Sequence, residues 1–211
     1  MRVALTRPDG QNEELAARLR RAGHEVEVHP LIAIEPLGDD PVGLDGYDWL
    51  VVTSANGAVE LARRAVGRPA RIAAVGDATA AALREAGFDV DLIPARSSQE
   101  GLLEELPASP GRVLLAAASD ARTLLPERTG ADHVALYRTR ELRPELAHAD
   151  MVVLASGSAA RALAAIRTDL PVVTIGPVTT RAARAAGLVV RAEAASQDVQ
   201  GLVDAIGRAG G

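Results

Sequence analysis

The 211-residue sequence contains an internal repeat, with two similar copies of about one hundred residues. Residues 72–106 match residues 172–206 at an offset of one hundred positions, and residues 48–61 match the region from 150 at an offset of 102. Examples of the identical pairs are Asp48 with Asp150, Ser54 with Ser156, Gly76 with Gly176, Thr79 with Thr179 and Gly101 with Gly201. Solenoid repeats run roughly 20–50 residues, so this longer period predicts two similar domains. Two copies of one fold can form a cleft, and ligands often bind in clefts between domains.

Strand-like and helix-like segments alternate along the chain, which predicts an α/β fold with parallel sheets covered on both faces. We interpret ten apolar runs as buried strands: Val3–Thr6, Glu25–His29, Trp49–Thr53, Arg71–Val75, Val90–Ile93, Val113–Ala117, Val134–Tyr137, Met151–Ala155, Val172–Ile175 and Val189–Arg191. The segments of helical period are Asn12–Ala22, Ala58–Ala65, Ala78–Ala86, Gln99–Leu106, Thr123–Arg128, Ala159–Ile166, Thr179–Ala186 and Val199–Arg208.

Two segments interrupt this alternation, at about residues 31–45 and 138–148. Both follow the second strand of a repeat, so we interpret them as linkers between the domains. A simple tandem arrangement would instead place its linker near Pro107–Gly111, which is also a good loop sequence. The residues alone leave both divisions of the chain open.

Composition excludes several classes of function. The formal charge of −5 and the 2% aromatic content argue against binding to nucleic acid or to an anionic membrane. All basic residues except histidine are arginine, so Schiff-base and P-loop lysine chemistry are excluded. The chain has no cysteine, which excludes disulfides and thiolate catalysis. No signal peptide or membrane-spanning run is evident, so we expect a cytoplasmic protein.

Six small polar loops follow predicted strands, where parallel α/β folds bind their ligands. They contain Thr6-Arg7, Ser54-Ala55-Asn56, Gly76-Asp77 with Thr79, Ser119, Ser156 with Ser158, and Gly176 with Thr179-Thr180. Loops of this kind present backbone N–H groups and hydroxyls, which bind carboxylates or phosphates. Each loop taken alone is better explained as a helix cap. Their recurrence at matched strand ends in both repeats favours a shared polar lining.

Strong catalytic groups are scarce. The four histidines show no metal-ligand spacing, so we expect no metal site, and neither Ser54 nor Ser156 lies in a serine-hydrolase motif. Tyr47 suits a packing role at the start of a strand. Tyr137 ends the last strand before the second linker, where its phenol could donate a proton or a hydrogen bond into the cleft.

The ordered set of short motifs resembles the uroporphyrinogen-III synthase family over the whole chain. The motifs are Thr6-Arg7-Pro8, Val52–Ala58, Val75–Ala80, Tyr137-Arg138-Thr139, Ser156-Gly157-Ser158 and Ile175–Thr180. The resemblance implies two flavodoxin-like parallel-sheet domains, an interlaced duplication and two extended linker strands. The first domain would comprise residues 1–33 and 143–211, and the second residues 37–137.

The resemblance also implies a cofactor-independent, cyclising lyase. It would close hydroxymethylbilane, a linear tetrapyrrole with eight carboxylates, to uroporphyrinogen III in the cleft, with inversion of ring D and loss of water. Tyr137 matches the family tyrosine proposed to assist departure of the hydroxyl. The substrate-binding residues would be Thr6, Arg7, Ser54, Ala55, Asn56, Gly76, Asp77, Thr79, Ser119, Ser156, Ser158, Gly176, Thr179 and Thr180. The resemblance implies a monomer, with the enzyme that makes hydroxymethylbilane as a candidate partner.

One alternative comes from a different class of protein. The same anion-binding loops would suit a non-catalytic, intracellular two-domain protein that binds a small polycarboxylate. A weaker alternative is a relative of the family that has lost its activity and serves in regulation.

Overall fold

The computed structural model describes residues 1–146 and 148–210, which form two compact units. Unit 1 comprises Met1–Ala33 and Thr139–Gly211, and unit 2 comprises Ile34–Arg138. Unit 1 is therefore built from both ends of the chain, and unit 2 is one continuous segment. Ala147, in the expected second linker, and Gly211 lie outside the described residues.

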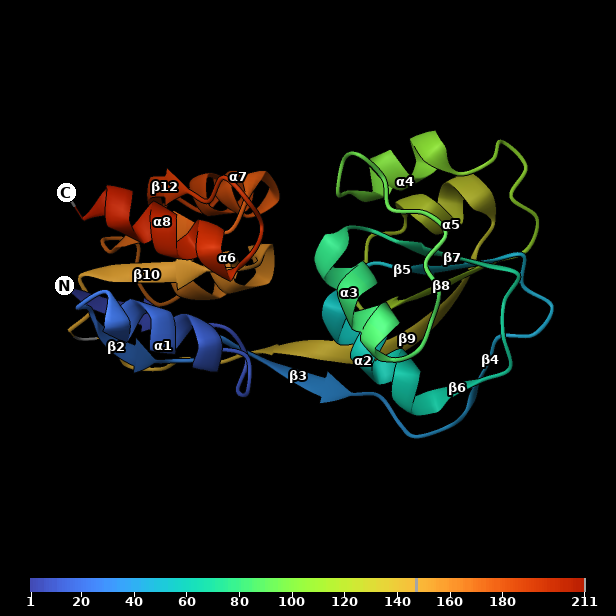
Figure 1. Ribbon diagram of the computed structural model, residues 1–211, viewed down its shortest axis with the longest axis horizontal. Helices are drawn as coiled ribbons and strands as arrows, with labels where there is room; N and C mark the ends of the chain where they lie inside the picture. The colour runs from blue at the N-terminus through green and yellow to red at the C-terminus, as the bar shows by residue number, and fades with distance from the viewer. Residues whose placement is uncertain (147, 211) are drawn as a thin grey trace. The chain divides into compact units, whose positions relative to one another are not determined.

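Unit 1 has a five-stranded, all-parallel sheet in the order β2-β1-β10-β11-β12 (Figure 1). The strands are β1 (Arg2–Leu5), β2 (Glu25–Val28), β10 (Met151–Leu154), β11 (Pro171–Thr174) and β12 (Val189–Glu193). The helices are α1 (Glu13–Arg21), α6 (Gly157–Ala164), α7 (Pro177–Ala185) and α8 (Val199–Ala209). In Figure 1 the blue N-terminal strands lie beside orange and red C-terminal elements.

Helices cover both faces of this sheet because alternate strand residues point in opposite directions. On β10, Val152 packs with Leu163 of α6 in one apolar cluster. The next residue, Val153, belongs to the opposite cluster together with Leu19 of α1 and Ile206 of α8. All five side chains are at most 1% exposed, so the thin two-sided core needs no large aromatic residues.

Unit 2 repeats this arrangement around a second sheet, in the order β3-β9-β8-β5-β7. The strands are β3 (Ile32–Pro36), β5 (Trp49–Val52), β7 (Arg71–Ala74), β8 (Val113–Ala118) and β9 (Asp132–Glu141). The helices are α2 (Ala55–Arg64), α3 (Asp77–Glu85), α4 (Gln99–Glu105) and α5 (Leu124–Thr129). Helices α2 and α3 cover one face, and α4 and α5 cover the other. A separate pair, β4 (Val42–Gly43) with β6 (Ala65–Val66), was not expected from the sequence.

Four strands of each unit have the same order, as the sequence repeat requires: β2-β1-β10-β11 in unit 1 corresponds to β9-β8-β5-β7 in unit 2. Strand β3 is an additional edge strand of unit 2. The matched strands β10 and β5 have matched neighbours: β10 pairs with β1, and β5 pairs with β8. The matched aspartates have matched contacts. Asp150 Oδ2 accepts a hydrogen bond from Arg2 N at 2.6 Å, and Asp48 Oδ2 accepts one from Arg112 N at 2.7 Å. The parallel sheets expected from the alternating pattern are confirmed.

The strand expected over Val90–Ile93 is wrong. Its counterpart β12 pairs with β11 over several residues, but here only an isolated bridge joins Leu92 to Ala73. The carboxylate of Asp91 accepts the backbone N–H of Ile72 at 2.7 Å. The Asp91 side chain, and not a neighbouring strand, therefore pairs with the Ile72 N–H at the edge of β7. A hydropathy pattern does not reveal this contact.

Both predicted linkers are partly strands. The border between the units falls inside β3, at Ala33/Ile34, and inside β9, at Arg138/Thr139. The two strands are hydrogen-bonded neighbours in the sheet of unit 2. The sequence suggested that Tyr137 ends a strand. Strand β9 instead continues to Glu141, so Tyr137 lies inside the strand.

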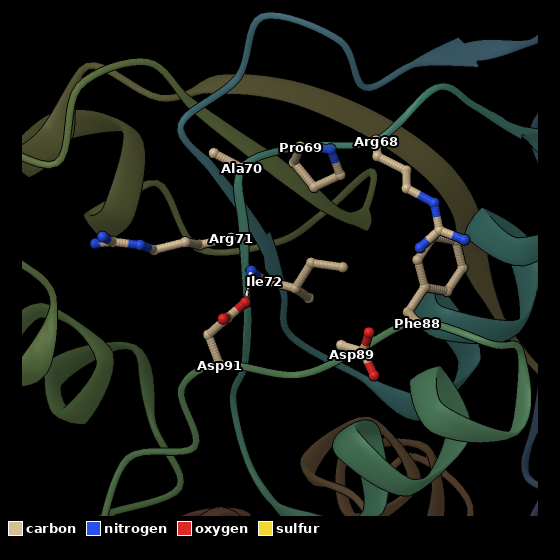
Figure 2. Close-up of a pocket in the computed structure, with 8 residues that line it drawn as sticks. All are labelled: Arg68, Pro69, Ala70, Arg71, Ile72, Phe88, Asp89 and Asp91. Atoms are coloured by element: carbon tan, nitrogen blue, oxygen red, sulfur yellow. Dashed lines mark hydrogen bonds between the residues drawn. The ribbon is translucent and has the colours of Figure 1, made fainter.

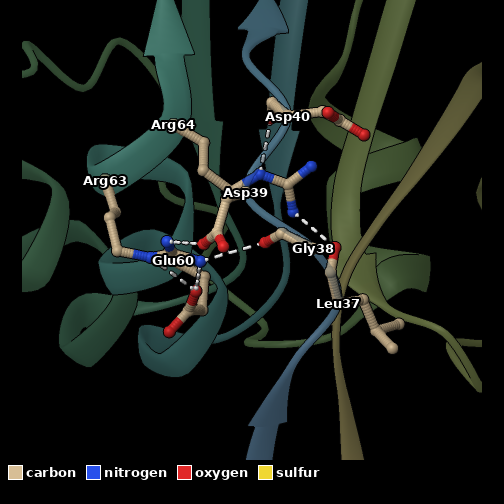
Figure 3. A network of polar contacts seen from close by, with 7 residues as sticks. All are labelled: Leu37, Gly38, Asp39, Asp40, Glu60, Arg63 and Arg64. Atoms are coloured by element: carbon tan, nitrogen blue, oxygen red, sulfur yellow. Dashed lines mark hydrogen bonds and ion pairs between the residues drawn. The ribbon is translucent and has the colours of Figure 1, made fainter.

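The loop after β3 is fastened to the last turn of α2 (Figure 3). Arg64, which is 8% exposed, donates from Nε to Asp40 O at 2.8 Å and from Nη1 to Leu37 O at 3.0 Å. Exposed Arg63 forms ion pairs with Asp39 and with Glu60. Burial of the Arg64 guanidinium is offset because it donates to two backbone carbonyls of the loop, which would otherwise lack a partner in the protein.

Candidate functional site

In unit 2 the polar strand ends gather where the chain leaves β5 and β8. These neighbouring parallel strands lead into helices on opposite faces of the sheet, α2 and α5. Such a switch point opens a crevice beyond the carboxyl ends of the strands, the usual ligand position in this type of fold. Ser54 and Ser119 lie at these two ends, and Tyr137 comes from the next strand, β9.

An irregularity in β9 directs Tyr137 towards this point. The register with β8 shifts between Ala117 and Ala118, so that Ala118 faces Tyr137. Leu136 and Tyr137, although consecutive, therefore both belong to the apolar cluster under α2 and α3. A bulge of this kind redirects a side chain that regular alternation would send to the other face.

The Tyr137 hydroxyl lies 2.8 Å from Ser54 Oγ. The tyrosine side chain is only 6% exposed, and this burial raises the pKa of its phenol above the usual value. The hydrogen bond with Ser54 lowers the pKa, and the charge of Asp120 raises it further. The phenol is therefore protonated at neutral pH, the form that can donate a proton or a hydrogen bond.

Ser54 also caps helix α2. Its Oγ accepts the backbone N–H of Gly57 at 2.9 Å, and α2 therefore begins at Ala55 and includes Asn56. The sequence predicted a start at Ala58, three residues late. Capping and a contact with the tyrosine are thus properties of the same hydroxyl.

The other matched pair of loops has no side-chain cap. Gly76 precedes α3 and Gly176 precedes α7, and glycine has no side chain that could cap the first helical turn. The first-turn N–H groups are the kind that bind carboxylates. In α3, exposed Asp77 places a negative charge beside these groups, whereas α7 has no acidic residue in its first turn. The two loops are therefore alike in backbone and different in charge.

Several of the expected binding hydroxyls are buried and engaged. Thr6 donates to Val153 O at 2.5 Å, and Thr180 lies 2.6 Å from Thr174 Oγ1. Thr79 and Thr179 are each 4% exposed. Thr6 lies directly after β1, and the other three threonines lie in the first turns of α3 and α7. Because these four side chains are buried, the groups that their loops offer to a ligand are chiefly backbone groups.

In unit 1, three further expected residues lie at the ends of β1 and β10, the corresponding switch point. Ser156 caps α6 through Ala159 N at 3.1 Å and lies 3.0 Å from Ser158 Oγ. Arg7 follows β1 and is half-buried. Burial lowers the pKa of the Arg7 guanidinium from its usual value, and Glu14 partly reverses this. The arginine remains a cation at neutral pH, suited to a carboxylate.

The sequence analysis missed two residues beside the uncapped loops. A Cβ at Gly76 would lie 2.7 Å from Ser97 Oγ, and one at Gly176 would lie 3.0 Å from Gln197 Cγ. Ser97 lies just before α4, and Gln197 lies just before α8, one hundred positions later in the sequence. The offset of the repeat could have revealed this pair. It did not, because serine and glutamine are different residue types and the comparison used identical residues.

A hollow of about 220 Å³ lies elsewhere in unit 2 (Figure 2). It is lined by Arg68, Arg71, Phe88, Asp89 and Asp91, among others. Arg71 begins β7, so this hollow is at the amino end of the sheet, away from Ser54 and Tyr137. Its mixed charges and its position separate it from the candidate site.

Within residues 1–146 and 148–210, no cluster of three or more His, Cys, Asp or Glu side chains could hold a metal ion. In the same part of the chain, no helix has the length and apolarity required to cross a membrane.

Comparison with known proteins shows the family to which the chain belongs. A family model described as Uroporphyrinogen-III synthase HemD matches residues 13–204. The chain belongs to the uroporphyrinogen-III synthase family. A relative from Methanocaldococcus jannaschii, whose own assignment to this activity is provisional, is 27% identical over 86% of this chain and 88% of its own length. The uroporphyrinogen-III synthase of Synechococcus elongatus is 32% identical over 50% of this chain and 45% of its own.

A solved structure of a uroporphyrinogen III synthase shares the fold. A mutant uroporphyrinogen III synthase from Thermus thermophilus matches with a TM-score of 0.70 and 19% identity, covering 99% of this chain and 98% of that one. The expected α/β architecture with parallel sheets is thereby confirmed for the whole chain.

Proposed function

We propose that the chain closes hydroxymethylbilane to uroporphyrinogen III, with inversion of ring D and loss of water, and that Tyr137 assists the loss of the hydroxyl. The observation that carries this proposal is the protonated Tyr137 phenol held against Ser54 at the switch point of unit 2, in a chain of this family. We further propose that the protein acts as a cytoplasmic monomer that receives its substrate from the enzyme that makes hydroxymethylbilane.

In the first step, the Tyr137 phenol donates its proton to the departing hydroxyl, which leaves as water. The resulting azafulvene cation is attacked by a substituted carbon of ring D to form a spiro intermediate. Fragmentation and reclosure on the other side of ring D invert that ring. The ring carbon then loses a proton, which balances the proton that the tyrosine gave. Little acid–base chemistry is required, and the protein acts mainly by holding one conformation.

The carboxylates of the substrate require several separate binding groups. We propose that they are held by the uncapped first turns of α3 and α7, by Arg7 and by the exposed hydroxyl of Ser119. Backbone N–H groups at helix N-termini bind anions without a strongly basic pocket. This agrees with a chain whose formal net charge is −5.

The decisive assay supplies freshly generated hydroxymethylbilane and separates the product isomers. We expect the type III isomer, formed catalytically, against a control without enzyme that closes to type I. Type I alone would contradict the proposed reaction. Stoichiometric capture of the substrate without turnover would indicate the binding protein considered above.

A further inference from the structure

We propose that Ser54 is a positioning residue, whose hydroxyl donates its hydrogen to the oxygen of Tyr137 and so leaves the phenolic proton free for the substrate. This inference rests on the proposed function, and it replaces the direct contact with substrate that the family resemblance implied for Ser54. It begins from two distances at one atom: Ser54 Oγ lies 2.9 Å from Gly57 N and 2.8 Å from the Tyr137 hydroxyl oxygen.

The hydrogen-bonding capacity of a serine hydroxyl limits what these contacts can be. The hydroxyl has one hydrogen to donate and two lone pairs to accept with. Gly57 N–H occupies one lone pair. If Tyr137 donated to the other, its own proton would be engaged inside the protein. If Ser54 donates instead, the Tyr137 proton can point to the ligand. Only the second polarity allows Tyr137 to act as the acid.

The same polarity stabilises the tyrosine after the proton has left. A phenolate can accept the Ser54 hydrogen but cannot donate, so this hydrogen bond strengthens as the charge develops. Gly57 N–H in turn donates to Ser54 Oγ from the first turn of α2, at the positive end of the helix dipole. The three groups form a chain of donors that runs from the helix to the tyrosine, and each bond in such a chain polarises the next.

The repeat supplies natural controls for the capping role. Ser156 caps α6 through Ala159 N, and Ser98 caps α4 through Gly101 N at 3.1 Å. The side-chain contact of Ser156 is Ser158, not a tyrosine. Substitution of Ser156 therefore removes a helix cap of the same kind without touching Tyr137.

The test measures Tyr137 directly. The chain has two tyrosines, so Tyr47→Phe leaves Tyr137 as the only source of tyrosinate absorbance. In that background we expect Ser54→Ala to raise the pKa of Tyr137, because a donor to the phenolate is lost. Ser54→Thr keeps the hydroxyl and should preserve the titration, and Ser156→Ala should leave it unchanged. Should Ser54→Ala fold poorly, Ser54→Gly serves, because glycine is a nearly equivalent helix cap.

Kinetics separate positioning from substrate binding. Loss of a hydrogen bond that strengthens in the transition state should lower kcat by about tenfold with little change in KM. A rise in KM at constant kcat would identify Ser54 as a substrate ligand and overturn the proposal.

An unchanged Tyr137 titration in both Ser54→Ala and Ser54→Gly would also overturn it, whatever the activity. If the titration shifts as expected but the wild-type protein forms only type I product, the proposed function fails and the hydrogen-bond polarity stands.

Discussion

At the scale of single residues, Tyr137 acquires its properties from its surroundings and not from neighbours in sequence. The bulge in β9 turns it toward Ser54, and burial raises the pKa of its phenol. Tyr47 is the opposite case. Its hydroxyl donates to Asp132 at 2.8 Å and its ring lies under Arg112, so its role is to tie strand ends together.

The contrast between the two tyrosines gives a first prediction. We expect Tyr137→Phe to lower kcat by about 100-fold, because a general acid is lost, while the free energy of unfolding falls by only about 1 kcal/mol. Tyr47→Phe should leave kcat unchanged. Steady-state turnover and urea denaturation of both variants provide the measurement. Full turnover by Tyr137→Phe would remove Tyr137 from the mechanism but would leave the assigned reaction intact.

The raised pKa of Tyr137 has a consequence for stability at alkaline pH. The unfolded chain releases the phenolic proton near the ordinary value of 10.0, and the folded chain releases it at higher pH. Between these two values the folded state binds more protons, so the free energy of unfolding decreases as the pH rises. We expect this decrease to be smaller in Tyr137→Phe than in wild type, as measured by urea denaturation across that range. If the free energy of unfolding fell equally with pH in wild type and in Tyr137→Phe, the Tyr137 phenol would have the same pKa in the folded and unfolded states.

At the scale of elements, α8 contains two glycines with opposite roles. A Cβ on Gly201 would lie 2.2 Å from the backbone oxygen of Ser196, and its matched partner Gly101 has the same conflict with Arg96 O. A Cβ on Gly207 would meet nothing within 4 Å. The first glycine allows the preceding loop to approach the helix closely, and the second only adds flexibility.

We therefore expect Gly201→Ala to lower the free energy of unfolding by roughly 1–3 kcal/mol, since the loop backbone must move. Gly207→Ala should raise it by about 0.5–1 kcal/mol, because alanine restricts the unfolded chain at no steric cost. Urea midpoints of the two variants against wild type measure both effects. Equal midpoints for the two variants would contradict the close approach at Gly201.

The elements that were predictable from sequence are those that periodicity alone defines. The buried strands and the helices that cover them appear within a few residues of their expected positions, because their apolar residues must face a core. The failures have a different cause. The start of α2 depends on the Ser54 cap, and the expected strand at Val90–Ile93 is reduced to a bridge beside the Asp91 side chain. Both are polar side-chain contacts whose partners are invisible to a hydropathy pattern.

For the candidate site, the sequence indicated which residues lie at the carboxyl ends of the strands but not which of their groups face outwards. Thr6 and Thr180 resemble ligand-binding residues in sequence, yet their hydroxyls are engaged inside the fold. The proximity of Ser54 and Tyr137, which are 83 residues apart, depends on sheet order and on a bulge. A single sequence contains neither.

At the scale of the whole molecule, each unit has its own two-sided core, so unit 2 should fold without unit 1. We expect a fragment Ile34–Arg138 to unfold in one cooperative urea transition. The only tryptophan of the chain, Trp49, belongs to this unit and is 6% exposed, so its fluorescence reports the packing. Emission typical of a solvent-exposed indole in the absence of urea would contradict the prediction.

A chain that lacks unit 2 tests whether unit 1 folds on its own. Leu142 N donates to Leu31 O at 2.8 Å, so its two segments are close where unit 2 is inserted. Residues 1–33 joined to 139–211 through a short glycine linker should form the parallel sheet, as circular dichroism would report. A disordered spectrum would show that unit 1 requires the inserted segment.

The insertion of unit 2 into unit 1 also determines the order in which the protein can be completed during translation. Strand β1 leaves the ribosome long before its neighbour β10, because Arg2 and its partner Asp150 are 148 residues apart. Unit 2 is fully synthesised in the meantime and can fold as domains do. Until β10 emerges, one edge of β1 remains unpaired and open to other strands. The residues of β1 thus reach one of their final neighbours only after unit 2 has been made, and the nascent protein is most prone to aggregation during that interval.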